Sequence, residues 1–173
     1  ERGPPGGSRR RGTRLRSEVA GLRCEARPRY SGNMNGPTPY VFFPGNAEEA
    51  LRFYQGVFGG DLQLSRYAEF RRGDGPGDAI AHGVLDGVVR LYGADAGFDE
   101  DAVNAGGLML ALLGTAEAAT LHRWFETLAT SGRVIEALEA RTWGAVDGQV
   151  QDQYGLRWLV GYETAAPNTR GQS

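Results

Sequence analysis

The fold of this chain follows from the stretch Asn46-Ala47-Glu48-Glu49-Ala50, which returns 69 residues later as Thr115-Ala116-Glu117-Ala118-Ala119. A second pair of matching stretches follows the same order. Gly87 precedes Val88-Val89-Arg90-Leu91, and 68 residues later Gly155 precedes Leu156-Arg157-Trp158-Leu159. Matches at a nearly constant offset indicate an internal duplication, in which neither copy can bury the apolar face of its sheet alone.

Each copy reads as a strand, a helix and three further strands. In the first copy, Asn46 is an expected helix N-cap and Gly59-Gly60 an expected helix end, and strands are predicted over 39–43, 62–70, 79–85 and 88–92. In the second copy, Thr115 is the expected N-cap and Ser131-Gly132 the helix end, with strands over 108–113, 134–138, 146–151 and 156–162. The sequence therefore predicts an α+β fold made of two βαβββ modules.

The module pattern also sets the expected domain limits. We expect one domain over 37–164, made of modules 38–93 and 107–162, and a disordered tail over 165–173. Residues 1–33 hold nine of the 19 Arg and only three acidic residues. We expect 1–36 to be a disordered basic leader, or upstream sequence before a natural start at Met34.

Composition excludes several classes of protein. The formal net charge of −2 argues against a nucleic-acid or anionic-membrane binder, and no apolar run reaches the ~18 residues of a membrane helix. The single cysteine, Cys24, supports neither a disulfide framework nor a cysteine metal site. The chain has no Lys, and therefore no Lys-containing phosphate loop. We expect a cytoplasmic protein without nucleic-acid or membrane partners.

Several motifs together resemble one superfamily. These are the paired modules, Asn46–Tyr54 with Val57-Phe58-Gly59-Gly60, and Trp143-Gly144. They resemble the vicinal oxygen chelate superfamily, which includes glyoxalases, bleomycin-resistance proteins and dioxygenases. The closing Asp152-Gln153-Tyr154-Gly155-Leu156-Arg157-Trp158 is similar to its PhnB-like branch. The resemblance implies a cup of about eight mixed strands with two main helices, a ligand inside the cup, and often a homodimer.

The resemblance also implies where enzymes of the superfamily hold a divalent metal. Those positions fall on the first and last strands of each module, at Pro39, Leu91, Leu108 and Leu159. Proline and leucine offer no ligating atom to a hard cation, so we expect no metal and no other cofactor.

Candidate site residues come from the strands. His82 is the best candidate for proton transfer near neutral pH, and the alternative is a histidine at the core edge bonded to backbone. Tyr40, Phe42 and Tyr92 either stack on a ligand in the cup or pack beneath a helix. Trp143 is either a pocket-rim residue or a packing residue.

Polar candidates complete the set. Gln149 and Gln151 share one face of a strand and offer neutral polar groups. Arg90 and Arg157 occupy similar positions in the two modules, where each either binds an anionic ligand or forms a surface ion pair.

Three functions fit these residues. We favour binding of a small organic molecule in a metal-free cup, as in resistance by sequestration. The first alternative is an enzyme of glyoxalase or dioxygenase type, either a lyase or isomerase that uses His82 or a metal-dependent reaction. The second alternative is a dimeric scaffold with a collapsed cup.

Overall fold

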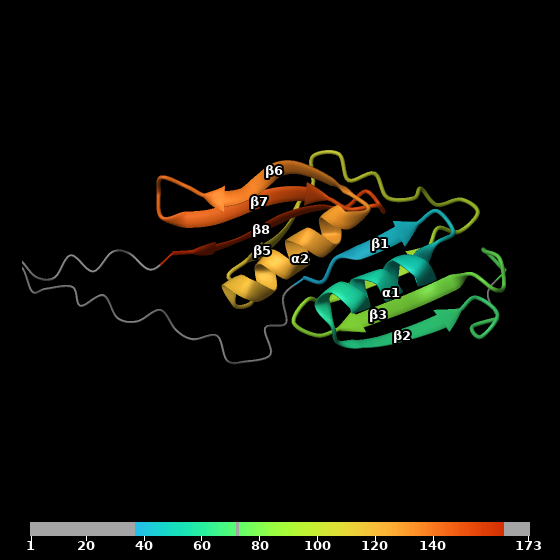
Figure 1. Ribbon diagram of the computed structural model, residues 1–173. Coiled ribbons are helices and arrows are strands. Elements are labelled where there is room, and N and C mark those ends of the chain that lie inside the picture. The colour runs from blue at the N-terminus through green and yellow to red at the C-terminus, as the bar shows by residue number, and fades with distance from the viewer. Residues whose placement is uncertain (1–36, 72, 165–173) are drawn as a thin grey trace, which may run out of the picture. The chain divides into compact units, whose positions relative to one another are not determined.

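The chain folds as two βαβββ modules, as the duplicated sequence predicts. A computed structural model describes residues 37–71 and 73–164, which all lie in one compact unit of the chain. The expectations for 1–36 and 165–173 fall outside these residues. Figure 1 shows the two modules, the first in blue to green and the second in yellow to red.

Each module contains one four-stranded mixed sheet. The first sheet has the order β1-β4-β3-β2 and the second β5-β8-β7-β6, with β1–β4 and β5–β8 parallel. The elements of the first module are β1 (Tyr40–Phe43), α1 (Ala47–Phe58), β2 (Asp61–Arg66), β3 (Ile80–Asp86) and β4 (Leu91–Asp95). Those of the second are β5 (Leu110–Leu113), α2 (Ala118–Thr130), β6 (Arg133–Ala140), β7 (Ala145–Gln151) and β8 (Arg157–Glu163). Among the described strands, each therefore pairs only within its own module.

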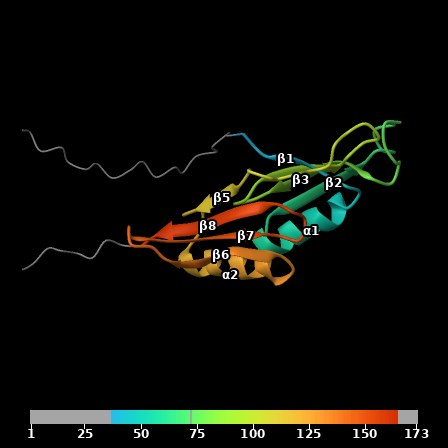
Figure 2. The ribbon, with the colours of Figure 1, turned by 90° about the horizontal axis from the view of Figure 1, so that it is seen from above.

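The two helices cover the same side of the sheets. In Figure 1 both lie in front of the strands, and Figure 2 shows the same arrangement from above. Each helix has an apolar face because its hydrophobic residues recur at helical spacing, and the buried set in α2 is Leu121, Trp124, Phe125 and Leu128. Neither α1 nor α2, the helices among the described residues, covers the opposite face of each sheet, and we call it the open face.

One apolar core runs through both modules. Phe58 of α1 contacts Trp124 of α2 with ring centroids 5.2 Å apart, and it contacts Trp158 of β8 at 5.1 Å. All three side chains are less than 9 % exposed. The modules thus complete each other's cores, as the sequence predicts for two halves that cannot stand alone.

A buried carboxylate, Asp152, fixes the junction of the modules. It lies in the turn between β7 and β8 and is 4 % exposed. Its Oδ2 accepts hydrogen bonds from the Tyr54 hydroxyl and the Trp158 indole, both at 2.8 Å. Its Oδ1 accepts from the backbone N–H groups of Tyr154 at 2.9 Å and Leu156 at 3.1 Å. Burial raises the pKa of Asp152, and the four donated hydrogen bonds oppose that rise.

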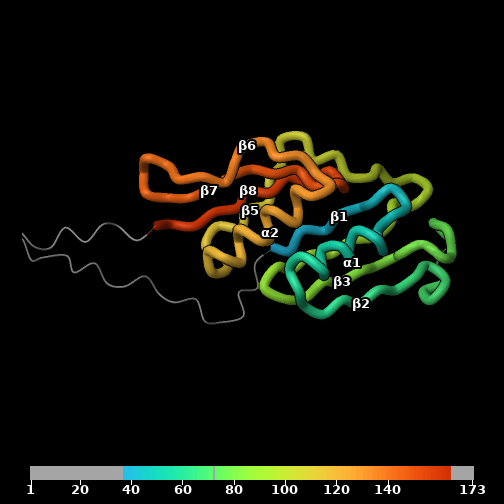
Figure 3. Tube along the Cα trace, in the orientation of Figure 1, coloured from blue at the N-terminus to red at the C-terminus, as the bar shows by residue number. Residues whose placement is uncertain are grey.

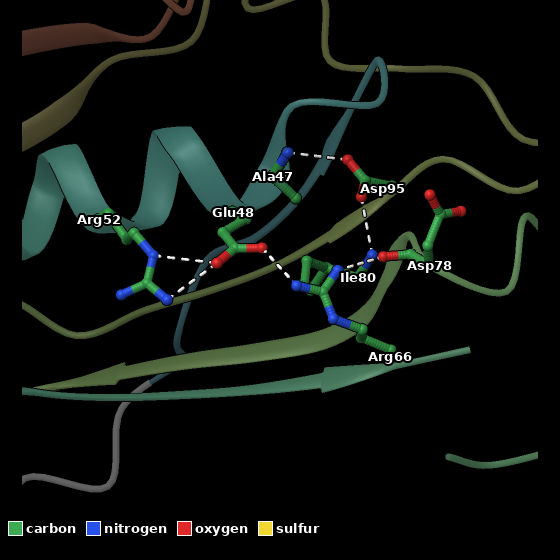
Figure 4. Close-up of polar contacts among 7 residues, drawn as sticks. All are labelled: Ala47, Glu48, Arg52, Arg66, Asp78, Ile80 and Asp95. Carbon is green, nitrogen blue, oxygen red and sulfur yellow. Dashed lines mark hydrogen bonds and ion pairs between the residues drawn. The ribbon is translucent and has the colours of Figure 1, made fainter. Parts of the chain in front are cut away.

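A second buried carboxylate, Asp95, accepts a hydrogen bond from the first residue of α1. Asn46 occupies the N-cap position as predicted, but its side chain makes no capping hydrogen bond. Instead the Ala47 N–H donates to Asp95 Oδ1 and the Ile80 N–H to Oδ2, both at 2.8 Å (Figure 4). The carboxylate therefore holds the starts of α1 and β3 to the end of β4.

Several predicted boundaries are wrong; for example, β5 begins at Leu110 rather than at 108, and β6 extends to Ala140 rather than ending at 138. The second helix begins at Ala118 after Glu117, not after Thr115, because Glu117 is extended (φ −62, ψ 149) and its carbonyl accepts the first helical hydrogen bonds, from Thr120 and Leu121. The predicted strand 62–70 ends at Arg66, where the chain enters a tight turn that includes Arg71 at φ 54. The predicted strand 88–92 begins only at Leu91, because the preceding residues form the β3–β4 hairpin loop.

Candidate ligand-binding site

Four rings gather on the open face of the first sheet. Because side chains alternate along β1, Val41 and Phe43 point into the core, whereas Tyr40 and Phe42 lie on the other face. Parallel pairing sets Tyr40 beside Tyr92, and β3 adds His82. We call the set the aromatic cluster, and its members are Tyr40, Phe42, His82 and Tyr92.

The rings of the aromatic cluster are in contact. The Tyr40 centroid lies 5.2 Å from that of Phe42, 5.6 Å from that of His82 and 6.4 Å from that of Tyr92. His82 and Tyr92 lie 5.8 Å apart. Tyr40 is 41 % exposed and the other three rings are half-buried, so the cluster offers a solvent-accessible aromatic surface.

His82 is hydrogen-bonded to a side chain of the aromatic cluster. Its Nδ1 lies 3.0 Å from the Tyr40 hydroxyl oxygen, and the same hydroxyl lies 3.5 Å from the Ala81 carbonyl oxygen. When Tyr40 donates to Nδ1, the imidazole proton is on Nε2. When Tyr40 donates to Ala81, the histidine carries its proton on Nδ1. The pair can therefore present either a donor or an acceptor at Nε2.

A pocket of about 270 Å³ adjoins the aromatic cluster. We call it the linker pocket, because the segment between the modules forms one of its walls. That segment is held by the Val103 N–H, which donates to the Phe42 carbonyl at 2.7 Å. Figure 3 traces the segment from the end of β4 to β5. The pocket is lined by Tyr40 and Phe42 of β1, Val103 and Ala105 of the linker, Leu110 of β5, and Arg157 of β8, among others.

The predicted residues of the second module lie apart from the aromatic cluster. Trp143 is 73 % exposed in the turn between β6 and β7, at the end of the second sheet far from the first module (Figure 1). Gln149 and Gln151 are on the open face of the second sheet. Gln149 accepts from Arg157 at 3.2 Å, and Gln151 accepts from Arg133 at 3.1 Å.

The structure separates Arg90 and Arg157, for which the sequence left the same two alternatives. Arg90 forms an ion pair with Asp86 at 2.8 Å, as the surface reading predicts. Arg157 instead binds only a glutamine among the described residues, and its Nε is buried without a hydrogen-bond partner there. The sequence analysis did not single out Arg133. The available signal was its place on a strand beside Gln151.

A second arginine missed by the sequence analysis has a structural role. Arg141, 12 % exposed at its side chain, lies within 3.1 Å of carboxylate oxygens of Glu136, Glu139 and Asp147. These carboxylates raise its pKa, with the Asp147 hydrogen bond as the largest cause. Its charge is already neutralised, so Arg141 is not available to a ligand.

The start of α1 also borders a pocket, of about 670 Å³. Glu48 there accepts from Arg52 at 2.8 Å and from Arg66 at 2.7 Å, and these two guanidinium groups hold the pKa of Glu48 below its usual value (Figure 4). Arg66 also donates to the Asp78 carbonyl. The charged groups of Glu48, Arg52 and Arg66 in Figure 4 thus bind one another.

The metal positions of the superfamily hold no suitable donors. Leu91 is 1 % exposed in the core, Leu108 is 58 % exposed, and Pro39 lines the linker pocket. Leu159 lies on the open face of β8 beside Gln149. Among residues 37–71 and 73–164, no group of three or more His, Cys, Asp or Glu could hold a metal ion. The side chains present do not fit the metal of the superfamily's enzymes.

No helix among the described residues is long and apolar enough to cross a membrane.

Known proteins share this architecture. Protein YjdN of Escherichia coli (strain K12) is 28 % identical over 141 residues, which cover 71 % of this chain and 92 % of YjdN. The crystal structure of PA1353 from Pseudomonas aeruginosa matches with a TM-score of 0.63 and 27 % identity, over 75 % of this chain and 98 % of PA1353. The PhnB protein from Bacillus cereus shares the fold with a TM-score of 0.59 and 24 % identity, over 75 % of this chain and 98 % of PhnB.

The family model for the superfamily matches residues 37–160, which is most of the chain and both modules. The chain belongs to the glyoxalase/bleomycin resistance protein/dioxygenase superfamily, and its structural relatives include PhnB and PA1353.

Proposed function

We propose that the protein binds a small organic molecule on the aromatic cluster without a metal ion. The observation that carries this proposal is the contact of four rings on an open sheet face, beside a pocket of about 270 Å³. Ligand sites combine apolar and aromatic walls with a few polar groups that fix orientation. Tyr40 and Phe42 supply the apolar surface, and the Tyr40–His82 pair supplies the polar groups.

Sequestration is the mode that this surface supports best. Binding needs only the stacking surface and a hydrogen bond at His82 Nε2, and no reaction step. The linker pocket beside the cluster favours this mode over a scaffold with a collapsed cup.

The proposal is tested by ligand-observed NMR with indole as a neutral aromatic probe. We expect saturation transfer from the protein to indole, and its loss in Tyr40→Ala. Phe98→Ala is the matched control, because Phe98 is an exposed aromatic residue (71 %) outside the cluster. Equal transfer in the wild type and in Tyr40→Ala would contradict the proposal.

An enzyme that uses His82 is the second candidate, and the 3.0 Å contact of His82 with Tyr40 favours it. A lyase or isomerase of this kind would remove a proton next to a carbonyl group. We would then observe exchange of the α-hydrogens of acetophenone in D₂O, catalysed by the wild type and lost in His82→Gln. Exchange at the uncatalysed rate in both proteins would exclude this reaction for the probe.

We also propose that the protein is a homodimer. Strand β6 is an edge strand of eight residues, and two of its residues, Val134 and Ile135, are 48 % and 39 % exposed. A long exposed edge with apolar side chains needs cover, and a second copy supplies it. Light scattering should give twice 18.7 kDa for the wild type and a monomer for Ile135→Glu, with Val88→Glu in the β3–β4 hairpin as control. A monomeric wild type would refute the homodimer.

The cytoplasmic location remains a prediction.

A further inference from the structure

We propose that the bound molecule is an organic anion, whose carboxylate or phosphate group binds between Arg133 and Arg157. This inference rests on the function proposed above and specifies its ligand class. The two arginines line a second pocket of about 550 Å³, which we call the arginine pocket.

The two guanidinium groups are placed by one row of residues across the second sheet. Arg133 of β6 pairs with Gln151 of β7, and Gln151 pairs with Arg157 of β8. Directly paired residues in antiparallel strands point to the same face, so all three side chains are on the open face. Each arginine donates to a glutamine oxygen, Arg133 to Gln151 and Arg157 to Gln149. These hydrogen bonds orient the guanidinium groups and leave their charges in place.

Neither charge is neutralised within residues 37–71 and 73–164. The nearest polar partners recorded for both arginines are amides, whereas Arg52, Arg66, Arg90 and Arg141 all have carboxylates within 4 Å. The arginine pocket has two arginines and no acidic residue in its described lining. Residues 34–173 carry 18 acidic residues against ten Arg, so an uncompensated basic pocket is unexpected by composition.

Arg157 supplies a donor that the protein itself leaves unused. Its Nε is buried and has no hydrogen-bond partner among the described residues. A buried donor without a partner destabilises the protein, and a shift of the side chain that lets an oxyanion reach this nitrogen would satisfy it. Guanidinium groups bind carboxylate and phosphate through two parallel hydrogen bonds, which makes these anions the matching ligands.

The arginine pocket adjoins the linker pocket. Both are lined by Val103, Ala105 and Arg157, while the linker pocket also reaches Tyr40 and Phe42. A molecule with its apolar body against these two rings would therefore place a terminal anionic group at Arg157. The ligand class is an aromatic or apolar body that carries one acidic group.

The test compares two probes of the same shape by calorimetry, 3-phenylpropionate and its neutral amide. We expect the acid to bind the wild type about ten-fold more tightly than the amide. Arg157→Gln and Arg133→Gln should each weaken the acid by about ten-fold and leave the amide unchanged. Arg90→Gln is the control, because Arg90 is ion-paired with Asp86 outside both pockets. Phenyl phosphate, as a third probe, identifies the preferred anionic group.

The outcomes separate this inference from the function on which it rests. Equal affinity for acid and amide, unchanged in Arg157→Gln but lost in Tyr40→Ala, would overturn the anion site and leave the aromatic site intact. Acid binding that is lost in Arg157→Gln but not in Tyr40→Ala would overturn the aromatic site and support the anion site. Melting curves should show that both arginine variants stay folded, because no ion pair of the described residues is broken; Arg157→Gln also removes the buried Nε that lacks a partner.

Discussion

Replacing Asp152 by Asn tests how the two modules are held together. The carboxylate accepts four hydrogen bonds, two at each oxygen, and asparagine keeps only one accepting oxygen. The backbone N–H groups of Tyr154 and Leu156 cannot rotate, so we expect the amide oxygen to face them. The amide nitrogen then faces Tyr54, whose hydroxyl can turn to accept, and Trp158, whose indole nitrogen cannot.

The expected cost follows from the one donor that is left without a partner. A buried unsatisfied donor costs about 1–3 kcal/mol, so Asp152→Asn should lower the free energy of unfolding by that amount. For a domain of 100–150 residues this corresponds to a fall in Tm of roughly 4–12 °C. Asp152→Ala leaves all four donors without a partner and should cost about 4 kcal/mol or more, which is close to the whole stability of a marginal domain.

Urea denaturation followed by circular dichroism measures these differences. Asp61→Asn is the matched control, because Asp61 is exposed at the start of β2, and it should change stability by less than about 0.5 kcal/mol. A midpoint for Asp152→Asn equal to that of Asp61→Asn would refute the role of the carboxylate.

Four further changes test other parts of the fold. Gly56→Ala should raise stability by about 0.5–1 kcal/mol in urea denaturation, because Gly56 is inside α1 and a Cβ there meets no atom within 4 Å. Gly132→Ala should lower it by about 1–3 kcal/mol, because its Cβ would collide with backbone atoms, and a neutral result would show that the turn can move. Asp95→Asn, judged by Tm, should cost about 1–3 kcal/mol because one of the two backbone donors it binds, such as the Ala47 N–H, loses its acceptor. Burial raises the pKa of Tyr54 far above 10, so only the unfolded chain ionises there, and this residue should make stability fall above pH 10 by about 1.4 kcal/mol per pH unit; the slope should be smaller by that amount in Tyr54→Phe.

The fold was predictable from the sequence because its signals are local and repeated. Helical spacing of apolar residues and period-two strands each identify an element, and their duplication identifies the architecture. The start of α2 was not predictable in this way. Thr115 is a better capping residue than Glu117, but the first helical hydrogen bonds of α2 are accepted by the Glu117 carbonyl.

The site residues were predictable only where the alternation of side chains along one strand fixes the face on which they lie. Alternation placed Tyr40 and Phe42 on one face, and the structure adds that His82 touches the same cluster. The side chains that an arginine contacts cannot be predicted from the sequence of its own strand alone. Arg90 has a carboxylate four residues away, whereas the environment of Arg157 depends on Gln149 from the neighbouring strand.

The closing motif, residues 152–158, contains both a buried carboxylate that stabilises the fold and an arginine of the proposed ligand site. Asp152 and Trp158 point into the core and bind each other, while Arg157, between the buried Leu156 and Trp158, lies on the open face. The turn that fixes the second module to Tyr54 of α1 therefore also positions the guanidinium group. Asp152→Asn should thus reduce stability and, by loosening this turn, weaken binding of 3-phenylpropionate. Arg157→Gln should weaken binding alone, so the two variants separate the position of the charge from the charge itself.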